Sequence, residues 1–293
     1  MKVYEQNNQV ILDGALNFNL DRILGYGEGN RWNKEDDGSY TGVVKGKILN
    51  VAQDDKKVYF NNTDLKDFQN IWFEYFDLGR DYDEINNKLK SMDNYISRAV
   101  DYLRGMRILN QDEWEMMITF IISANNSMTM LQKVVENLSE KFGDYLGEYK
   151  GRKYYAFPTP KQLSLASLED IRSCKTGYRD KYIKSAADNI VNNDIDIYKF
   201  KELNTEKCIE ELKKFDGVGT KVADCIALFG MKKYDTFPMD VWMKRIMKEF
   251  YIKEDMSVEK IRKYSIDKFG ELSAFVQQYL FHYVREVGLD NLK

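Results

Sequence analysis

Short apolar runs alternate with polar residues near the amino terminus of the chain. Between residues 38 and 62, the runs 40–44 and 58–60 are rich in β-branched and aromatic residues, and the turn residues Asp54 and Asp55 separate them. Runs of this kind, bounded by turns, are typical of antiparallel strands. We therefore predict an antiparallel β-sheet within roughly the first hundred residues.

Helical periodicity replaces this pattern from about residue 84. Apolar residues recur three and four positions apart in the stretch 131–142, which Gly143 ends, and again in 182–190. Asn110, which precedes acidic residues, is expected to cap a helix. The sequence thus predicts an α+β protein, with an N-terminal antiparallel β-sheet domain over residues 1–105 and a mostly α-helical domain over residues 106–293.

The charge balance of the whole chain does not favour binding to nucleic acid. Lys and Arg total 44 against 47 Asp and Glu, which gives a net charge of -3. A DNA-binding face would need a local basic patch, for which the pairs 213–214, 232–233 and 244–245 are candidates. Taken alone, such charges also suit ordinary solvated helices, and the acidic composition favours an unrelated helical scaffold protein.

Cysteine use and hydropathy indicate the compartment. Cys174, Cys208 and Cys225 show no paired spacing and leave an odd thiol, which favours a reducing compartment over a disulfide framework. The longest apolar stretch is too short to span a bilayer. We expect a cytoplasmic protein, associated with the nucleoid in a bacterium or located in the nucleus of a eukaryote.

The segment 212–229 combines a glycine turn with the start of a helix. Gly217 and Gly219 bracket one residue, so they permit a tight turn with close backbone approach. A helix that begins after them would point its free N–H groups outward, an arrangement suited to a phosphate. By itself, the same pattern also fits an ordinary turn between two helices.

A lysine occupies the first turn of this expected helix. If the helix begins near Thr220, then Lys221, Cys225 and Phe229 share one face. The positive end of the helix dipole and partial burial of Lys221 would both favour a neutral, nucleophilic amine. The spacing equally fits an exposed lysine that contacts a phosphate.

Asp240 lies where a further helix is expected to begin. It follows Pro238 by two residues and precedes an amphipathic stretch, so it suits a helix N-cap. Its carboxylate also has the chemistry to orient or deprotonate a lysine and to stabilise positive charge on a sugar as its base departs. The two roles are compatible.

The segments FDGVGTKVADCIALF (215–229) and FPMDVW (237–242) resemble the helix-hairpin-helix, Gly/Pro-Asp DNA glycosylases, and among these the 8-oxoguanine branch. Further segments match in the family's order: 27–32, 120–126, 177–179 and 277–281. Their combination is far more specific than a single glycine or lysine. The resemblance implies a bifunctional DNA glycosylase and abasic-site lyase that excises 8-oxoguanine from double-stranded DNA.

By this resemblance, Lys221 would attack C1′ of the damaged nucleotide and form a Schiff base through which the strand is cut by β-elimination. Asp240 matches the family's essential aspartate. The base must first leave the duplex and enter a pocket. The residues that match this pocket are Gly27, Cys225, Gln277 and Phe281. The Gly27 carbonyl would accept the N7–H that 8-oxoguanine has and guanine lacks.

Other matching residues would contact the rest of the duplex. Asn125, Tyr178 and Arg179 match residues that face the partner base or fill the vacated stack. Met130 stands where the best-known relatives carry an arginine that reads cytosine. Because a thioether cannot donate those hydrogen bonds, we predict relaxed specificity for the opposite base.

The glycine turn and its neighbours match the family's phosphate-binding hairpin. The backbone groups concerned are those of Gly217, Val218, Gly219 and Val222. The same hairpin can hold a hard cation on main-chain carbonyls, which here would be those of Lys213, Phe215 and Val218.

The resemblance also sets expectations for cofactors, partners and rival functions. It implies no cofactor and no catalytic metal, since no cysteine follows Cys225 to build an iron–sulfur site. It implies a monomer that acts on duplex DNA containing 8-oxoguanine and does not bind a membrane. His282, the only histidine, lies beside Phe281, and we expect it to be packed rather than catalytic. Two alternatives stay open: a glycosylase of the same fold for another damaged base, and a helix-hairpin-helix module that binds DNA without catalysis.

Overall fold

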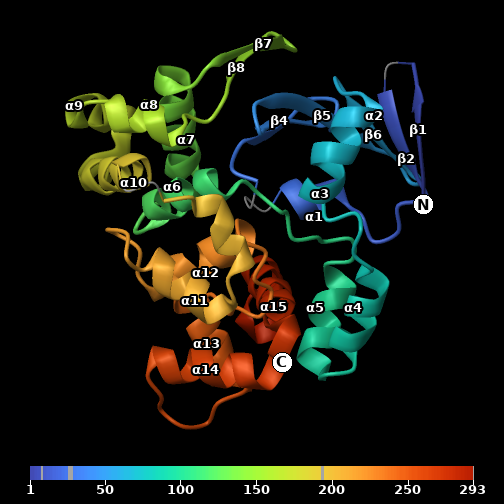
Figure 1. Cartoon of the computed structure of the whole chain (residues 1–293). Coiled ribbons are helices and arrows are strands. Elements are labelled where there is room, and N and C mark those ends of the chain that lie inside the picture. Colours follow the sequence, from blue (N-terminus) through green and yellow to red (C-terminus); the bar gives the residue numbers. More distant parts are fainter. Residues whose placement is uncertain (8, 26–28, 193–194, 293) are drawn as a thin grey trace.

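The computed structural model describes residues 1–7, 9–25, 29–192 and 195–292 (Figure 1). A six-stranded sheet forms the N-terminal part, and every neighbouring pair of strands is antiparallel. In spatial order the strands are β1 (Lys2–Gln6), β2 (Gln9–Asp13), β6 (Lys57–Asn61), β5 (Lys47–Gln53), β4 (Tyr40–Val44) and β3 (Trp32–Lys34). The predicted antiparallel sheet is confirmed, and the two runs singled out in the sequence are β4 and β6.

Alternation along the strands gives this sheet its own core. Val10, Phe60 and Val51 pair across three neighbouring strands, and each is fully buried. Phe60 also meets Phe68 edge to face at 5.0 Å between ring centroids. Four helical elements cover this face. One is α1 (Leu20–Leu24), which lies between β2 and β3, and the others follow β6: α2 (Leu65–Asp67), the π-helical turn Phe68–Trp72 and α3 (Phe73–Tyr75).

Helices build the rest of the chain, so the predicted fold class is confirmed. They are α4 (Tyr82–Lys90), α5 (Asn94–Tyr102), α6 (Glu113–Ser123), α7 (Met128–Phe142), α8 (Pro160–Leu165), α9 (Leu168–Ile171), α10 (Asp180–Asn192), α11 (Thr205–Leu212), α12 (Thr220–Phe229), α13 (Val241–Phe250), α14 (Val258–Phe269) and α15 (Ser273–Val287). Short turns lie at Arg172–Thr176, Gly177–Arg179, Ile197–Glu202, Gly270–Leu272 and Leu289–Leu292, and a hairpin joins β7 (Tyr145–Tyr149) to β8 (Arg152–Tyr155). Within the described ranges, no helix combines the length and apolarity that a membrane crossing requires.

The cap predicted at Asn110 is wrong. Helix α6 begins at Glu113, and the Asp112 carboxylate accepts the Glu115 N–H at 3.0 Å. Asn110 instead donates to the Glu74 carbonyl at 2.8 Å and accepts the Tyr234 hydroxyl at 2.5 Å. Its side chain therefore joins distant segments rather than the turn next to it.

Helix α12 lies between two helical cores. Its residues Cys225, Leu228 and Phe229 pack with α5, α13 and α15, whereas Ala223, Ile226 and other side chains of α12 pack with α6, α7, α10 and α11. All of residues 222–229 are buried. A helix that is buried on all sides suits the centre of a domain rather than its surface.

One charged pair is built into this central helix. Asp224 is fully buried, and both of its oxygens accept hydrogen bonds from Arg262 of α14, at 2.5 and 2.6 Å. Burial raises the pKa of Asp224, and the guanidinium opposes that effect. The bidentate pair fixes α12 against α14.

We predict that Arg262→Met lowers the free energy of unfolding by ~3 to 5 kcal/mol at neutral pH, because it leaves a buried carboxylate without its partner. Adding Asp224→Asn to the same protein should recover most of that loss. Urea denaturation measures both values, and the exposed neighbour Lys263 provides the control Lys263→Met. A loss below ~1 kcal/mol in Arg262→Met would show that the pair does not hold α12.

Candidate active site

A cavity of about 510 Å³ opens where α6, α12, α15 and the segment before α13 meet. It brings together most of the side chains that the sequence singled out for catalysis and base binding: Lys221, Cys225, Asp240, Gln277 and Phe281. These residues are separated by up to sixty positions in the chain. The size of the cavity falls within the range of small-molecule sites, ~300–1,000 Å³, so a single base fits it.

Helix α12 presents its lysine at the entrance of this cavity. The helix begins at Thr220, and Lys221, Cys225 and Phe229 all line the cavity, as their spacing predicted. The Lys221 ammonium lies 5.8 Å from the centroid of the Phe120 ring. The partial burial expected for Lys221 is wrong: the residue is exposed, while the rest of α12 after it is buried.

Cys225 forms part of the cavity wall one turn further along α12. It is 5 % exposed, and burial raises the pKa of its thiol to about 11, an effect that Lys221 opposes. The thiol is therefore neutral at physiological pH, which makes Cys225 a polarisable wall and a poor nucleophile. Of the two neighbours on this face, the lysine is the better placed for attack.

Asp240 caps α13 and faces the same cavity. Its Oδ1 accepts the Met243 N–H at 2.8 Å, so the predicted cap is confirmed. Asp240 is half-buried and lines the cavity together with Pro238. The cap fixes the carboxylate at the end of a helix, where it shares the cavity with Lys221.

Helix α15 supplies a further wall. Gln277 is 4 % exposed, and its Oε1 accepts a hydrogen bond from Gln278 at 2.7 Å, which fixes its orientation. Phe281 is half-buried and meets the His282 ring edge to face at 5.2 Å. His282 is buried against the Gln278 carboxamide at 3.0 Å, so it is packed as expected.

Gly27, the predicted acceptor of N7–H, lies outside the described residues. The described part resumes at Gly29, and the side chain of the next residue, Asn30, lines the cavity. The sequence did not single out Asn30, although it lies inside one of the matching segments. Arg31, which follows it, donates to the Tyr155 carbonyl at 2.5 Å and to Glu136 at 3.3 Å.

The residues expected to face the partner strand lie on two segments. Asn125 lies between α6 and α7 and Met130 in the first turn of α7, whereas Tyr178 and Arg179 lie in the turn Gly177–Arg179. Tyr178 is 52 % exposed and Met130 is 40 % exposed, so both are accessible. Arg179 is only 8 % exposed, and its guanidinium donates to the carbonyls of Ala124 and Asn125. The arginine therefore joins the turn Gly177–Arg179 to the segment between α6 and α7.

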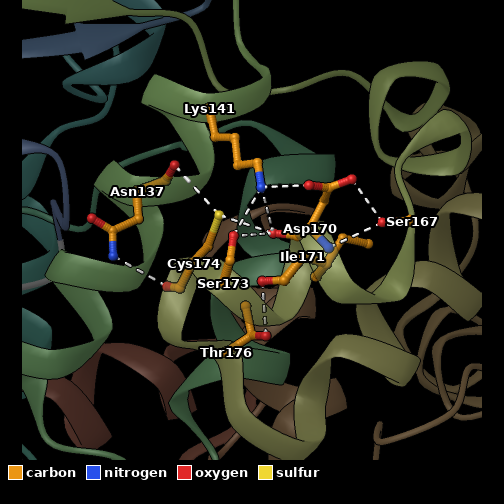
Figure 2. A network of polar contacts seen from close by, with 8 residues as sticks. All are labelled: Asn137, Lys141, Ser167, Asp170, Ile171, Ser173, Cys174 and Thr176. Atoms are coloured by element: carbon orange, nitrogen blue, oxygen red, sulfur yellow. Dashed lines mark hydrogen bonds and ion pairs between the residues drawn. The ribbon is translucent and has the colours of Figure 1, made fainter.

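The turn that precedes Tyr178 is held by a polar network (Figure 2). Lys141 of α7 donates to the Asp170 carboxylate at 2.7 Å and to Ser173 at 2.8 Å. One turn earlier on α7, the Asn137 amide donates to the Cys174 carbonyl at 3.2 Å. Figure 2 shows the side chains of Asn137 and Lys141 next to the turn Arg172–Thr176. Lys175, near the end of this turn, has a left-handed backbone with a φ of 68°.

The glycine turn before α12 has the tight geometry that was expected. Gly217 has a φ of 81°, and a Cβ there would lie 2.9 Å from the Tyr182 ring. Gly219 caps α12 without a side chain, so the first N–H groups of the helix face outward. Val222 is buried, which leaves only its backbone for a phosphate contact.

The same turn contains the carbonyls considered for a hard cation. Lys213 is the C-cap of α11, and the Phe215 carbonyl accepts the Val218 N–H at 3.1 Å. A carbonyl oxygen keeps a second lone pair for a cation. Elsewhere in the described part of the chain, no group of three or more His, Cys, Asp or Glu side chains could hold a metal ion.

Comparison with known proteins connects this chain to DNA repair. Residues 10–117 match the family described as 8-oxoguanine DNA glycosylase, N-terminal domain, and residues 118–270 match the HhH-GPD superfamily base excision DNA repair proteins. A probable N-glycosylase/DNA lyase of Methanothermobacter thermautotrophicus is 32% identical over 234 residues, which cover 73% of this chain and 74% of that protein.

Solved structures show the same similarity over nearly the whole chain. The 8-oxoguanine glycosylase/lyase of Clostridium acetobutylicum, in complex with double-stranded DNA containing cytosine opposite 8-oxoguanine, is 44% identical with a TM-score of 0.93 and covers 98% of each chain. MBOgg1, in complex with a low-affinity DNA ligand, is also 44% identical, with a TM-score of 0.94 and coverage of 98% and 99%. The chain therefore belongs to the HhH-GPD superfamily of base excision DNA repair proteins and carries the N-terminal domain of the 8-oxoguanine DNA glycosylases.

Proposed function

We propose that this protein is a bifunctional DNA glycosylase and abasic-site lyase that excises 8-oxoguanine from duplex DNA. The observation that carries the proposal is a cavity of about 510 Å³, large enough for a base, that is lined by an exposed lysine, an aspartate fixed by a helix cap and an aromatic wall. A base in the duplex stack cannot reach such a cavity, so the nucleotide must be flipped out. The relatives named above act on DNA, which agrees with this requirement.

Lys221 is the nucleophile in this proposal. Its Nζ attacks C1′, the C1′–N9 bond breaks, and the base departs with a proton. The C1′–O4′ bond of this adduct then breaks and O4′ takes a proton, which leaves a Schiff base between Nζ and C1′. Loss of a C2′ proton from the Schiff base expels the 3′ phosphate, and the strand is cut. Asp240 stabilises the positive charge that grows on the sugar as the base departs.

The cavity walls select the base. Cys225 and Phe281 offer two apolar surfaces for a flat purine, and Gln277 offers a carboxamide for its Watson–Crick edge. The Gly27 carbonyl is the proposed acceptor for N7–H. Because guanine has a lone pair at N7 and no hydrogen, the same carbonyl repels the undamaged base.

Other residues contact the duplex around the flipped base. Tyr178 enters the stack that the base leaves, and Asn125 and Arg179 face the partner strand. The hairpin at Gly217 and Gly219 binds phosphates. The protein acts as a monomer in the compartment that holds the DNA, and the hairpin carbonyls can bind a hard cation.

Two other functions fit the site less well. A glycosylase for another base would need a different pocket chemistry, and a DNA-binding module without catalysis would not need the cavity.

Borohydride trapping tests the nucleophile. Incubation with an 8-oxoguanine duplex and sodium borohydride should give a covalent protein–DNA band, because reduction makes the Schiff base irreversible. Lys221→Gln should abolish the band, whereas Lys253→Gln, a change at an exposed lysine, should keep it. The absence of a band with folded wild-type protein would refute the lyase activity.

Asp240→Asn separates the cap of α13 from the chemistry. Asparagine caps a helix about as well as aspartate, so the free energy of unfolding should change by less than ~0.5 kcal/mol. Single-turnover excision should slow by ~100-fold or more, since the neutral amide cannot balance the positive charge. Equal rates for the two proteins would remove Asp240 from the mechanism.

Met130→Arg should increase the preference for cytosine opposite the lesion by ~10-fold, because a guanidinium can donate to the base that a thioether cannot read. The measurement is single-turnover excision of 8-oxoguanine opposite each of the four bases. Thr129→Arg adds the same charge at the exposed neighbouring position and should leave the preference unchanged. An identical shift in both variants would attribute it to charge alone.

A further inference from the structure

Two lysines lie side by side near the residues expected to contact the duplex. Lys133 belongs to α7, and Lys175 lies near the end of the turn Arg172–Thr176. Both residues are exposed. Close contact with the Lys133 ammonium lowers the pKa of Lys175. Because like charges repel each other, the packing of the two segments must hold them together.

Helix α7 packs along the turn and brings the two ammonium groups together. Four residues of α7 are three or four positions apart and share one face of the helix: Met130, Lys133, Asn137 and Lys141. The last two bind the turn through the contacts in Figure 2, where Asn137 donates to the Cys174 carbonyl. Lys133 lies one helical turn before Asn137. Lys175 directly follows Cys174, so it contacts Lys133.

The backbone of the turn fixes Lys175 in this place. Its φ of 68° is a conformation that residues other than glycine rarely adopt. The preceding Cys174 is buried, and so is Thr176, whose hydroxyl donates to the Ile171 carbonyl at 3.1 Å. Lys175 is therefore exposed between two anchored residues. A turn that combines a strained backbone with repulsion between charges is typical of a ligand-binding segment.

The charges of the two lysines are not balanced by the fold. Lys141, on the same face of α7, pairs with Asp170 at 2.7 Å. Lys133 and Lys175 form no ion pair within the part of the chain that the structure describes. This arrangement occurs on a protein whose net charge is -3. An anion that accepts hydrogen bonds from both ammonium groups would remove their repulsion.

The surroundings of the pair indicate which anion it binds. Met130 lies three positions before Lys133, and Tyr178 lies three positions after Lys175. Both of these residues are exposed, and the proposed function places both beside the base pair that contains the lesion. The position of Met130 is the one expected to face the base opposite the lesion. The backbone of that strand is therefore the source of negative charge within reach of the lysines.

We propose that Lys133 and Lys175 together bind a backbone phosphate of the strand opposite the lesion. The inference rests on the proposed function and deepens it by adding a phosphate subsite. A phosphate contact positions the strand without reading its base. Because the Met130 thioether cannot donate to the opposite base, the lysine pair supplies affinity that is equal for all four opposite bases.

Uncharged phosphate analogues test the contact directly. In the Lys221→Gln background, which prevents base removal, affinity is measured for 8-oxoguanine duplexes that carry a single methylphosphonate at successive positions of either strand. At one position of the opposite strand, the parent protein should lose ~5-fold or more in affinity, and the double variant Lys133→Gln, Lys175→Gln less than ~2-fold. Equal losses for both proteins at every position, or such coupling on the lesion strand alone, would overturn the proposal.

Salt dependence and the opposite base give two further readouts. The double variant should lower the slope of log affinity against log salt concentration by ~1, which corresponds to one lost phosphate contact. The control Lys260→Gln, Lys263→Gln removes two positive charges from exposed positions of α14 and should leave the slope unchanged. The loss of affinity should agree within ~2-fold for the four bases opposite the lesion. A loss confined to one opposite base would contradict the proposal.

Two results distinguish this inference from a folding defect and from the proposed function. The double variant should melt at the temperature of the parent protein or higher, because the repulsion between the lysines has been removed. If the wild type gives no borohydride crosslink, the proposed function fails, and the methylphosphonate scan still decides the phosphate contact. If the crosslink forms and the scan shows no coupling, only the role of the two lysines fails.

Discussion

Burial of α12 on all sides is the constraint on which the site depends. The helix fills the space between two cores, and every side chain from residue 222 to 229 is buried. Only the first turn can reach solvent, and Lys221 lies there. The packing of the two cores thus leaves the Lys221 amine accessible at the cavity. The bidentate Asp224–Arg262 pair fixes the position of α12 relative to α14.

The surroundings of Lys221 and Cys225 give the two residues different roles. Both lie on one face of α12, but burial raises the pKa of the Cys225 thiol to about 11, whereas Lys221 is open to the cavity entrance. A neutral thiol and an accessible amine lie one helical turn apart. The two roles therefore differ because Lys221 lies in the exposed first turn of α12 and Cys225 lies in its buried part.

Local signals in the sequence were enough for the elements that carry the chemistry. The glycine turn, the start of α12 at Thr220 and the cap at Asp240 follow from backbone sterics and hydrogen bonding over a few residues. Asn110 was misread because its partners, Glu74 and Tyr234, are distant in sequence and outweigh a local cap.

Properties that depend on the tertiary fold could not be predicted in this way. The exposure of Lys221, the burial of Arg179 against loop carbonyls and the contact between Lys133 and Lys175 all depend on which segments meet. The hairpin of β7 and β8 was also missed, since its apolar residues show no clear alternation. The sequence therefore indicated where the chemistry lies, while the structure shows how accessible each group is.

The central claim is that the Lys221 amine forms the covalent bond to the sugar. The most direct measurement is the mass of the proteolytic peptides after the wild-type protein is reduced with borohydride on an 8-oxoguanine duplex. The account predicts a sugar adduct on the peptide that contains Lys221, with the bond located at that residue by fragmentation. An adduct at another lysine or at the terminal amine would contradict it.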